Sequence, residues 1–130
     1  MPAPHSYDYA LIRVVPRPER EEFINVGAIL FSRTLRFLGA QLALDRQRLR
    51  AFAPALDIDT VERYLQTIPR ICAGKPDGGP IGLLPQSERF HLLVILRSTV
   101  VQASPVHSGL CDNPAAALER LVETLVRAPQ

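Results

Sequence analysis

The chain has 130 residues, of which 47% are hydrophobic and none is Trp, so it is long enough for one domain with an aliphatic core. The formal net charge of +2 argues against a dedicated nucleic-acid-binding protein. The only cysteines, Cys72 and Cys111, are too few and too far apart in the sequence for a disulfide scaffold or a metal knuckle. No apolar run approaches the length of a membrane span and the N-terminus lacks a signal-peptide pattern, so we expect a cytoplasmic protein with reduced thiols.

The first predicted strand covers residues 7–15, after a tail at residues 1–6 that we expect to be loose. Aromatic and β-branched residues favour a strand here, and both of its faces are largely apolar. A strand of that kind is typical of the interior of a sheet. Pro16 and Pro18 end it, because proline has no backbone N–H to donate.

Residues 23–32 and 35–44 are the next two predicted strands, joined by a tight turn at Arg33 and Thr34. Together they predict a β-hairpin. Gly27 lies in the middle of the first of these strands, where a glycine indicates a bulge or another group packed close against the backbone.

Two helices are predicted in the middle of the chain. Asp45 can cap a short helix over residues 46–52. The next helix is expected to begin near Asp59, which has the spacing of a capping box, and Cys72 falls on its apolar stripe as a core residue. Pro69 is expected to kink this helix or to end its regular part.

Residues 90–96 are apolar on both faces and predict the fourth strand, with residues 99–102 continuing it or pairing beside it. Asn113 followed by Pro114 predicts the start of a last helix with one apolar stripe. Strand runs and helix runs are segregated along the chain. The predicted fold is therefore α+β, with a mostly antiparallel sheet of about four to five strands and two to three helices packed on it, in a single domain that spans the chain.

A group of polar side chains follows the predicted fourth strand, where a buried strand and its loop do not obviously need them: Arg97, Ser98, Thr99, Gln102, Ser104 and His107. One hypothesis is a polar pocket in which Arg97 binds a phosphate or a carboxylate and His107 acts as a general acid or base. The alternative is structural, with Arg97 paired to a carboxylate and the hydroxyls bonded to loop backbone. Asn25 joins this candidate pocket, because a buried Asn inside an apolar strand needs partners.

Four further residues are secondary candidates for a site: Arg13, Glu22, Glu88 and Arg89. Paired carboxylates could serve acid–base or metal chemistry, but surface ion pairs with nearby arginines are the simpler account of the two glutamates. His107 and Cys111 could form a base and a thiol nucleophile, although a free Cys is most often a small hydrophobic residue. No cluster has metal-site spacing, and no motif requires a cofactor.

Four segments carry a resemblance to a known family: Tyr7 to Tyr9, Arg20 to Gly27, Gln86 to His91 and Arg97 to Cys111. They resemble a family of small bacterial proteins catalogued as domain of unknown function 3037, and the resemblance covers nearly the whole chain. The family has no established activity, and its members are often encoded beside a HipA-like kinase. The resemblance therefore implies a role that depends on a protein partner.

The leading functional hypothesis is a non-catalytic accessory module that binds a protein partner, with the HipA-like kinase as the partner that the resemblance implies. Dimerisation through a sheet edge, or through the helix that carries Arg46, Arg48 and Arg50, is a second form of this hypothesis. The alternative is a small enzyme or anion-binding domain that acts on a phosphorylated or nucleic-acid ligand through the segment Arg97–His107. Direct DNA binding by the three helix arginines ranks last, given the near-neutral net charge.

Overall fold

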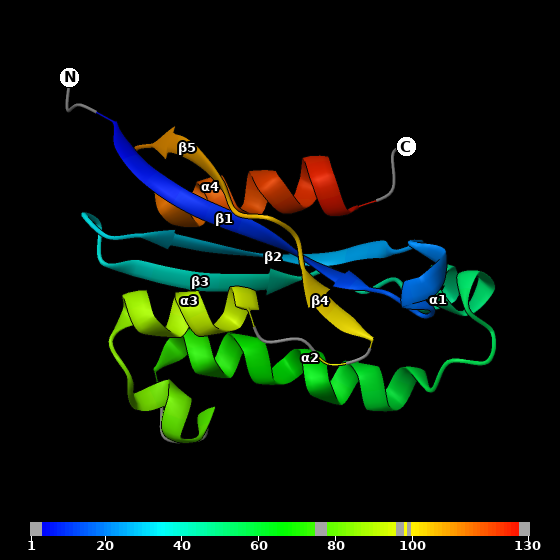
Figure 1. Ribbon diagram of the computed structural model, residues 1–130. Coiled ribbons are helices and arrows are strands. Elements are labelled where there is room, and N and C mark those ends of the chain that lie inside the picture. Colours follow the sequence, from blue (N-terminus) through cyan, green and yellow to red (C-terminus); the bar gives the residue numbers. More distant parts are fainter. Residues whose placement is uncertain (1–3, 75–77, 96–97, 99, 128–130) are drawn as a thin grey trace.

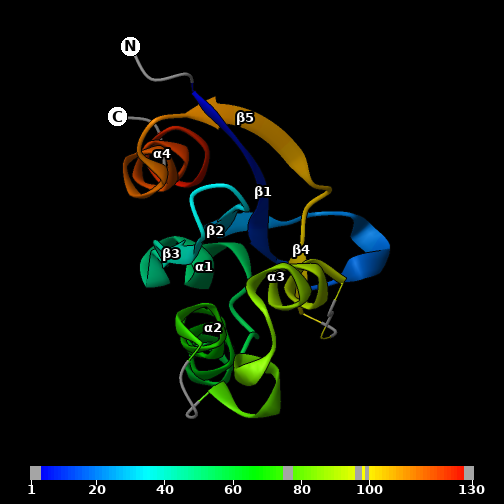
Figure 2. The same cartoon turned by 90° about the vertical axis from the view of Figure 1, so that its left-hand side faces the viewer.

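The computed structural model describes residues 4–74, 78–95, 98 and 100–127. A five-stranded antiparallel sheet forms the middle layer. Two helices, α2 (Ile58–Ala73) and α3 (Gln86–Ile95), cover one face of the sheet, and α4 (Pro114–Leu121) covers the other (Figures 1 and 2). The predicted α+β class with an antiparallel sheet is confirmed.

The strands are β1 (His5–Val14), β2 (Ile24–Ser32), β3 (Phe37–Leu42), β4 (Val101–Ala103) and β5 (His107–Cys111). Their order is β3-β2-β1, and both β4 and β5 pair with the remaining edge of β1. The central strand is therefore β1, which begins two residues earlier than predicted and contacts three other strands.

A β-bulge lies where β1 pairs with β2. Ile12 is opposite Gly27 and Arg13 is opposite Asn25, so Val26 has no residue opposite it. A Cβ atom on Gly27 would lie only 2.7 Å from the backbone oxygen of Gln41, so a larger residue does not fit without displacing the backbone of β3. Both features that the glycine predicted, the bulge and the close approach, are confirmed, as is the β2–β3 hairpin.

The α-helices are α1 (Arg46–Phe52), α2 (Ile58–Ala73), α3 (Gln86–Ile95) and α4 (Pro114–Leu121), and a π-helical turn, η4 (Val122–Val126), continues α4. Short 3₁₀ turns lie at η1 (Pro18–Arg20) and η3 (Pro80–Leu83). The predicted cap at Asp45 is confirmed, since its side chain accepts the backbone N–H of Arg48 at 3.0 Å. Asn113 caps α4 in the same way, accepting from the backbone N–H of Ala116 at 3.1 Å.

The predicted strand at residues 90–96 is wrong. Its residues up to Ile95 belong to α3, whose buried residues Arg89, Phe90 and Leu93 have helical spacing. A short apolar run fits a buried strand and a buried helix equally well, so the pattern alone did not separate them.

The cap of α2 differs from the prediction, and one of the two outcomes predicted for Pro69 is excluded. Asp57, and not Asp59, caps the helix, and it accepts the backbone N–H of Thr60 at 3.2 Å. Pro69 lies inside α2, which continues to Ala73, so the proline does not end the helix. Cys72 is buried in the core as predicted.

The core has two parts, one on each face of the sheet. The larger part lies between the sheet and α2 and α3, and it includes Ile12, Val14, Ile29, Leu65 and Phe90. The smaller part lies under α4 and η4, and it includes Ala28, Leu30, Leu118, Val122 and Val126. The side chains of successive β1 residues point to opposite faces of the sheet. The position of a polar residue in β1 therefore determines on which face it lies.

Candidate functional site

Two members of the predicted polar pocket, Arg97 and Thr99, lie outside the described residues. Ser98 is described, and its hydroxyl oxygen accepts the backbone N–H groups of Val100 and Val101 at 3.2 and 2.8 Å. These hydrogen bonds shape the turn that leads into β4. The position of Ser98 therefore matches the structural alternative for that residue.

Ser104 lies in a second bulge, between β4 and β5. Residues 104–106 stand opposite two residues of β1, because Ile12 pairs with Ala103 and Tyr9 pairs with His107. Ser104 is buried, and its hydroxyl accepts the backbone N–H of Leu11 at 2.8 Å and donates to the carbonyl of Pro105 at 2.8 Å. Both capacities of the hydroxyl are used by the backbone, so this serine has a structural role.

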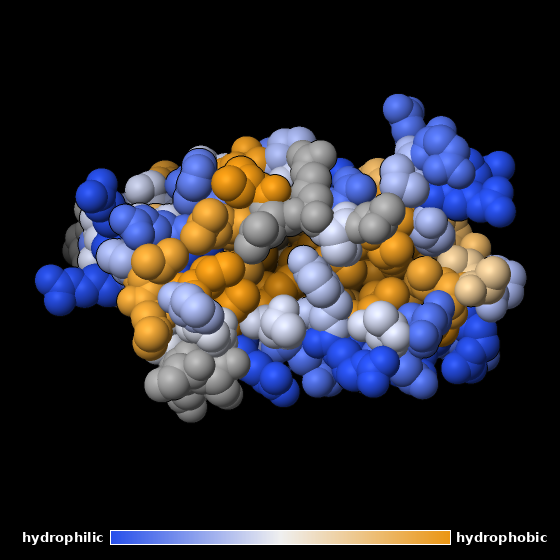
Figure 3. Space-filling view, turned by 60° about the horizontal axis from the view of Figure 1, so that its bottom comes forward, coloured by the Kyte–Doolittle hydropathy of each residue, from blue (hydrophilic) through white to orange (hydrophobic). Residues whose placement is uncertain are grey.

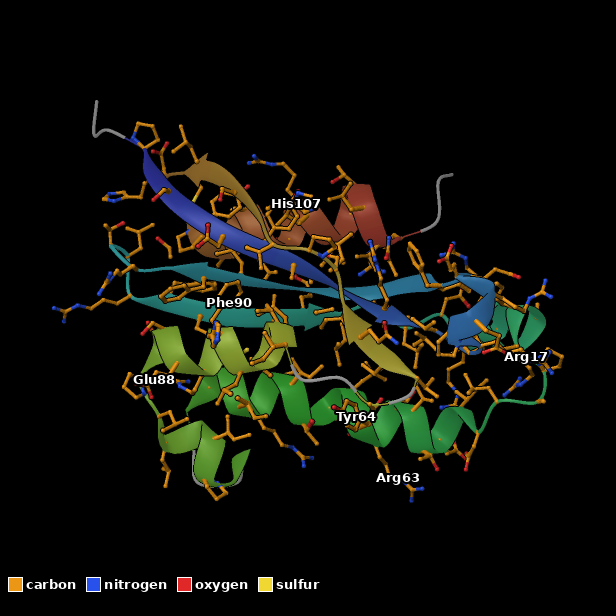
Figure 4. All side chains as sticks on the ribbon, viewed as in Figure 1. Arg17, Arg63, Tyr64, Glu88, Phe90 and His107 are labelled. Carbon is orange, nitrogen blue, oxygen red and sulfur yellow. The ribbon has the colours of Figure 1, made fainter. Side chains whose placement is uncertain are left out.

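His107 is exposed on β5, and its ring lies 5.5 Å from the ring of Tyr9, measured between centroids. Figure 4 places it on the α4 side of the sheet, away from Arg17 and Glu88 at the two ends of the molecule. Cys111 is four residues further along the same strand, a separation of about 13 Å. Burial, followed by the charge of Asp112, raises the pKa of the Cys111 thiol, so neither distance nor ionisation supports a thiol–base pair.

Tyr7 covers the part of β5 between those two residues. Gly109 pairs with Tyr7, and a Cβ atom on this glycine would lie 2.5 Å from the tyrosine hydroxyl oxygen. Burial, followed by the nearby Cys111 and Tyr9, raises the pKa of Tyr7. The tyrosine is therefore a packing residue of the smaller core, and Gly109 is required by its ring.

Three of the candidate residues do lie together. Arg13 of β1 is directly opposite Asn25 of β2 on one side and Gln102 of β4 on the other. Directly opposed residues of antiparallel strands share a face of the sheet, and this face is the one that carries α4 and η4. All three side chains are half-buried.

The surroundings of this polar row are unusual. The Arg13 guanidinium carbon lies 4.0 Å from the centroid of the Phe23 ring, a cation–π contact. The Asn25 amide donates to the backbone oxygen of Leu125 in η4 at 3.2 Å. Within the described part of the chain, Arg13 Nε and Asn25 Oδ1 are buried and have no hydrogen-bond partner.

The other secondary candidates have separate, structural surroundings. Glu22 forms a surface ion pair with Arg20, as predicted. Arg89 is 8% exposed and donates to the backbone oxygens at the C-terminal end of α2, to Ile71 at 2.9 Å and Cys72 at 2.7 Å. It also donates to Leu84, so it joins the end of α2 to the start of α3. Glu88 is exposed on α3, at the opposite end of the molecule from Arg17 (Figure 4), which lines the same cleft as Glu22.

The arginines of α1 are not equivalent. Arg46 forms ion pairs with Asp59 at 2.7 Å and Glu62 at 3.0 Å, which raise its pKa and connect α1 to α2. Arg48 and Arg50 are exposed. Because Arg46 is paired with two carboxylates, α1 has less free positive charge for a phosphate backbone.

Sequence reasoning missed a cleft of about 470 Å³. It lies between the β1–β2 connection and the α1–α2 connection, and its lining includes Arg17, Arg20, Phe52 and Pro54. The signal for it was proline at both connections, Pro16 and Pro18 in the first and Pro54 in the second, which are far apart in the sequence. Arg20 is already paired with Glu22 there, and the cleft includes none of the predicted pocket residues.

In the part of the chain that the structure describes, exposed large apolar side chains lie in three places, of which one, at Phe23 and Leu125, adjoins the polar row. Hydrophobic residues form a band on the face made by α2 and α3 (Figure 3), where Tyr64, Leu83 and Ile95 are the exposed large ones. The third place is the edge of the sheet at β5, where Val106 is 45% and Leu110 is 66% exposed. Among the described residues, β5 pairs only with β1, so its outer edge has no partner strand.

Two absences hold for the residues that the structure describes. No group of three or more His, Cys, Asp or Glu side chains among them could hold a metal ion. None of the described helices is long and apolar enough to cross a bilayer.

The family model described as "Protein of unknown function (DUF3037)" matches residues 9–126, which include the polar row, both bulges and the β5 edge. The chain belongs to this family. No curated protein and no solved structure matches the chain. The match confirms the DUF3037 resemblance noted in the sequence, while the neighbouring HipA-like kinase stays a prediction.

Proposed function

We propose that this DUF3037 protein is a non-catalytic interaction module that binds a protein partner at its β5 edge. The observation that carries the proposal is an edge strand that exposes apolar side chains and has no partner strand within the described residues. An exposed strand edge presents unpaired N–H and C=O groups, to which a strand of another protein can add.

The composition of this edge supports the proposal. Natural edge strands are usually protected against pairing by charged side chains or by an inward-facing charge. Residues 104–111 contain no Asp, Glu, Lys or Arg, and the one proline, Pro105, lies in the bulge before β5. The other edge strand, β3, is covered more completely, since its residues are half-buried or buried.

The arrangement of the polar side chains favours binding over catalysis. The hydroxyls of Ser98 and Ser104 are engaged by backbone groups, and His107 and Gln102 are on opposite sides of the bulge. A general acid or base needs a second reacting group within hydrogen-bond reach. Within the described part of the chain, His107 makes no side-chain hydrogen bond, and the Tyr9 ring lies beside it.

The partner proposed is the HipA-like kinase, and this part of the proposal rests on the family resemblance. The test is co-expression of the tagged chain with the kinase encoded beside it, followed by affinity capture and size-exclusion chromatography. Leu110→Lys adds a charge to the proposed edge, whereas Leu83→Lys adds the same charge to η3, where the leucine is 69% exposed compared with 66% for Leu110.

The expected result is a complex with the wild-type chain and with Leu83→Lys, and a loss of affinity of about tenfold or more for Leu110→Lys. A complex that loses affinity only with Leu83→Lys would move the interface to the α2–α3 face. Self-association of the chain without the kinase, abolished by Leu110→Lys, would assign the edge to a second copy. The proposal fails if the wild-type chain neither captures the kinase nor self-associates.

A further inference from the structure

We propose that Arg13, Asn25 and Gln102 form a phosphate-binding site on the face of the sheet that carries α4. This inference goes beyond the protein interaction proposed above, and it uses the β1–β2–β4 end of the sheet and not the β5 edge. The site takes a phosphate group, either as the free ion or as a phosphate monoester.

The β-bulge of β2 is what assembles the site. Without the extra residue, Val26 would be opposite Arg13, since Gly27 is opposite Ile12. The bulge instead keeps Val26 and Ile24 in the larger core and places Asn25 beside Arg13. Bulges are frequent next to binding sites, because they re-aim a side chain without breaking the sheet.

The π-helical turn lies against the same place. The Leu125 oxygen that accepts from Asn25 belongs to η4, a five-residue π-helical segment at the end of α4. Segments of this kind are rare and are often found at functional sites. The hydrogen bond fixes the orientation of the Asn25 amide, with its Oδ1 atom turned away from Leu125.

The polar groups without a hydrogen-bond partner determine which kind of ligand the site can bind. Arg13 forms no ion pair among the described residues, its Nε is buried without a partner, and the Phe23 ring fixes its guanidinium. Asn25 Oδ1 is an acceptor without a donor. Gln102, on the other side of Arg13, adds an amide that has no side-chain hydrogen bond in the described part.

Phosphate fits this set better than carboxylate. An ionised carboxylate only accepts hydrogen bonds, so it would satisfy Arg13 and leave Asn25 Oδ1 unpaired. A phosphate that keeps one proton offers oxygens to the guanidinium and an O–H to the Asn25 oxygen. The planar guanidinium fork is also well suited to phosphate oxygens.

The test measures the melting temperature and the side-chain NMR signals of the intact chain. Inorganic phosphate, phosphoserine, acetate and chloride are titrated at matched ionic strength and about pH 6, where a large share of both the free ion and the monoester keeps the proton that Asn25 Oδ1 would accept. Arg13→Gln and Gln102→Glu are the test variants. The second places a carboxylate opposite Arg13 and keeps the protein testable if the first fails to fold. Arg17→Gln, at an exposed arginine of the cleft, is the matched control.

The expected result is a saturable rise in melting temperature with phosphate or phosphoserine for the wild type and Arg17→Gln, together with shifts of the Arg13 Nε–H and Asn25 amide signals. Acetate produces a smaller rise, and both test variants lose the phosphate effect. Equal effects of phosphate on all four proteins would overturn the proposal, because they would show a general salt effect or an internal water bridging Arg13 and Asn25. A response to phosphoserine alone would assign the site to a phosphate monoester.

Discussion

Ser104 takes both backbone hydrogen bonds of Leu11: its hydroxyl accepts the Leu11 N–H at 2.8 Å, and its own N–H donates to the Leu11 oxygen at 2.8 Å. The side chain thereby replaces a main-chain carbonyl at the point where the chain bulges. Pro105 has no N–H to donate to the hydrogen bonds between the strands, and the bulge is a position where a proline is tolerated for that reason. The two hydrogen bonds between Ser104 and Leu11 hold the bulge to β1, so that β4 and β5 pair with the same edge of β1 one after the other.

Ser104→Ala is expected to destabilise the fold. It would leave the half-buried N–H of Leu11 without an acceptor, at a cost of about 1–3 kcal/mol in the free energy of unfolding, measured by urea denaturation. Ser108→Ala is the control, because its hydroxyl donates to Asp8 at an exposed site, and its cost should stay below about 1 kcal/mol. Equal costs for the two variants would contradict the role given to Ser104.

Arg89→Met should be more disruptive than any exposed arginine substitution. It removes the donors to Leu84, Ile71 and Cys72 and leaves their carbonyl oxygens buried, so a loss of about 2–4 kcal/mol is expected. Arg63→Met removes an exposed arginine of α2 and should change stability by about 0.5 kcal/mol or less. The account of Arg89 fails if chemical denaturation finds both variants near the wild type.

Stability should fall in alkali because of Cys72. Burial raises the pKa of this thiol from 9.0 to about 12, and the nearby Arg89 charge opposes the rise only in part. Between these values the unfolded chain has released the thiol proton while the folded chain retains it, so a rise in pH favours unfolding. This thiol alone should lower the free energy of unfolding by up to about 1.4 kcal/mol per pH unit above pH 9.

The control for the alkaline effect is Cys72→Ala. The variant is less stable at every pH because it leaves a cavity, but its free energy of unfolding should fall less steeply between about pH 9 and pH 10.5. Tyr7 and Cys111 contribute equally to both proteins, so the difference in slope reports Cys72. Identical slopes would show that the thiol ionises normally in the folded state.

Local signals in the sequence predicted much of the fold. The β2–β3 hairpin and the caps at Asp45 and Asn113 depend on residues only a few positions apart, and all three are confirmed. Whether residues 90–96 form a strand or a helix depended instead on what packs around them. Residues of α3 pack against the end of α2, where Arg89 donates to backbone oxygens 17 and 18 residues away in the chain, and no local pattern reveals such contacts.

The candidate site was accessible to sequence reasoning only in part. Asn25 could be singled out, because an amide within an apolar strand needs partners. Its position beside Arg13 depends on a one-residue bulge, and that of Gln102 depends on which strand fills the last edge of β1. Register and strand order are set by contacts across the whole chain, so no local pattern could place the three residues in one row.

The central claim is that a partner strand pairs with β5, and amide hydrogen exchange of the chain with and without the HipA-like kinase tests it most directly. The claim predicts that exchange in residues 106–111 slows by about tenfold or more in the complex, while exchange in α2 is unchanged. A complex that forms without slowing exchange in residues 106–111 would contradict it.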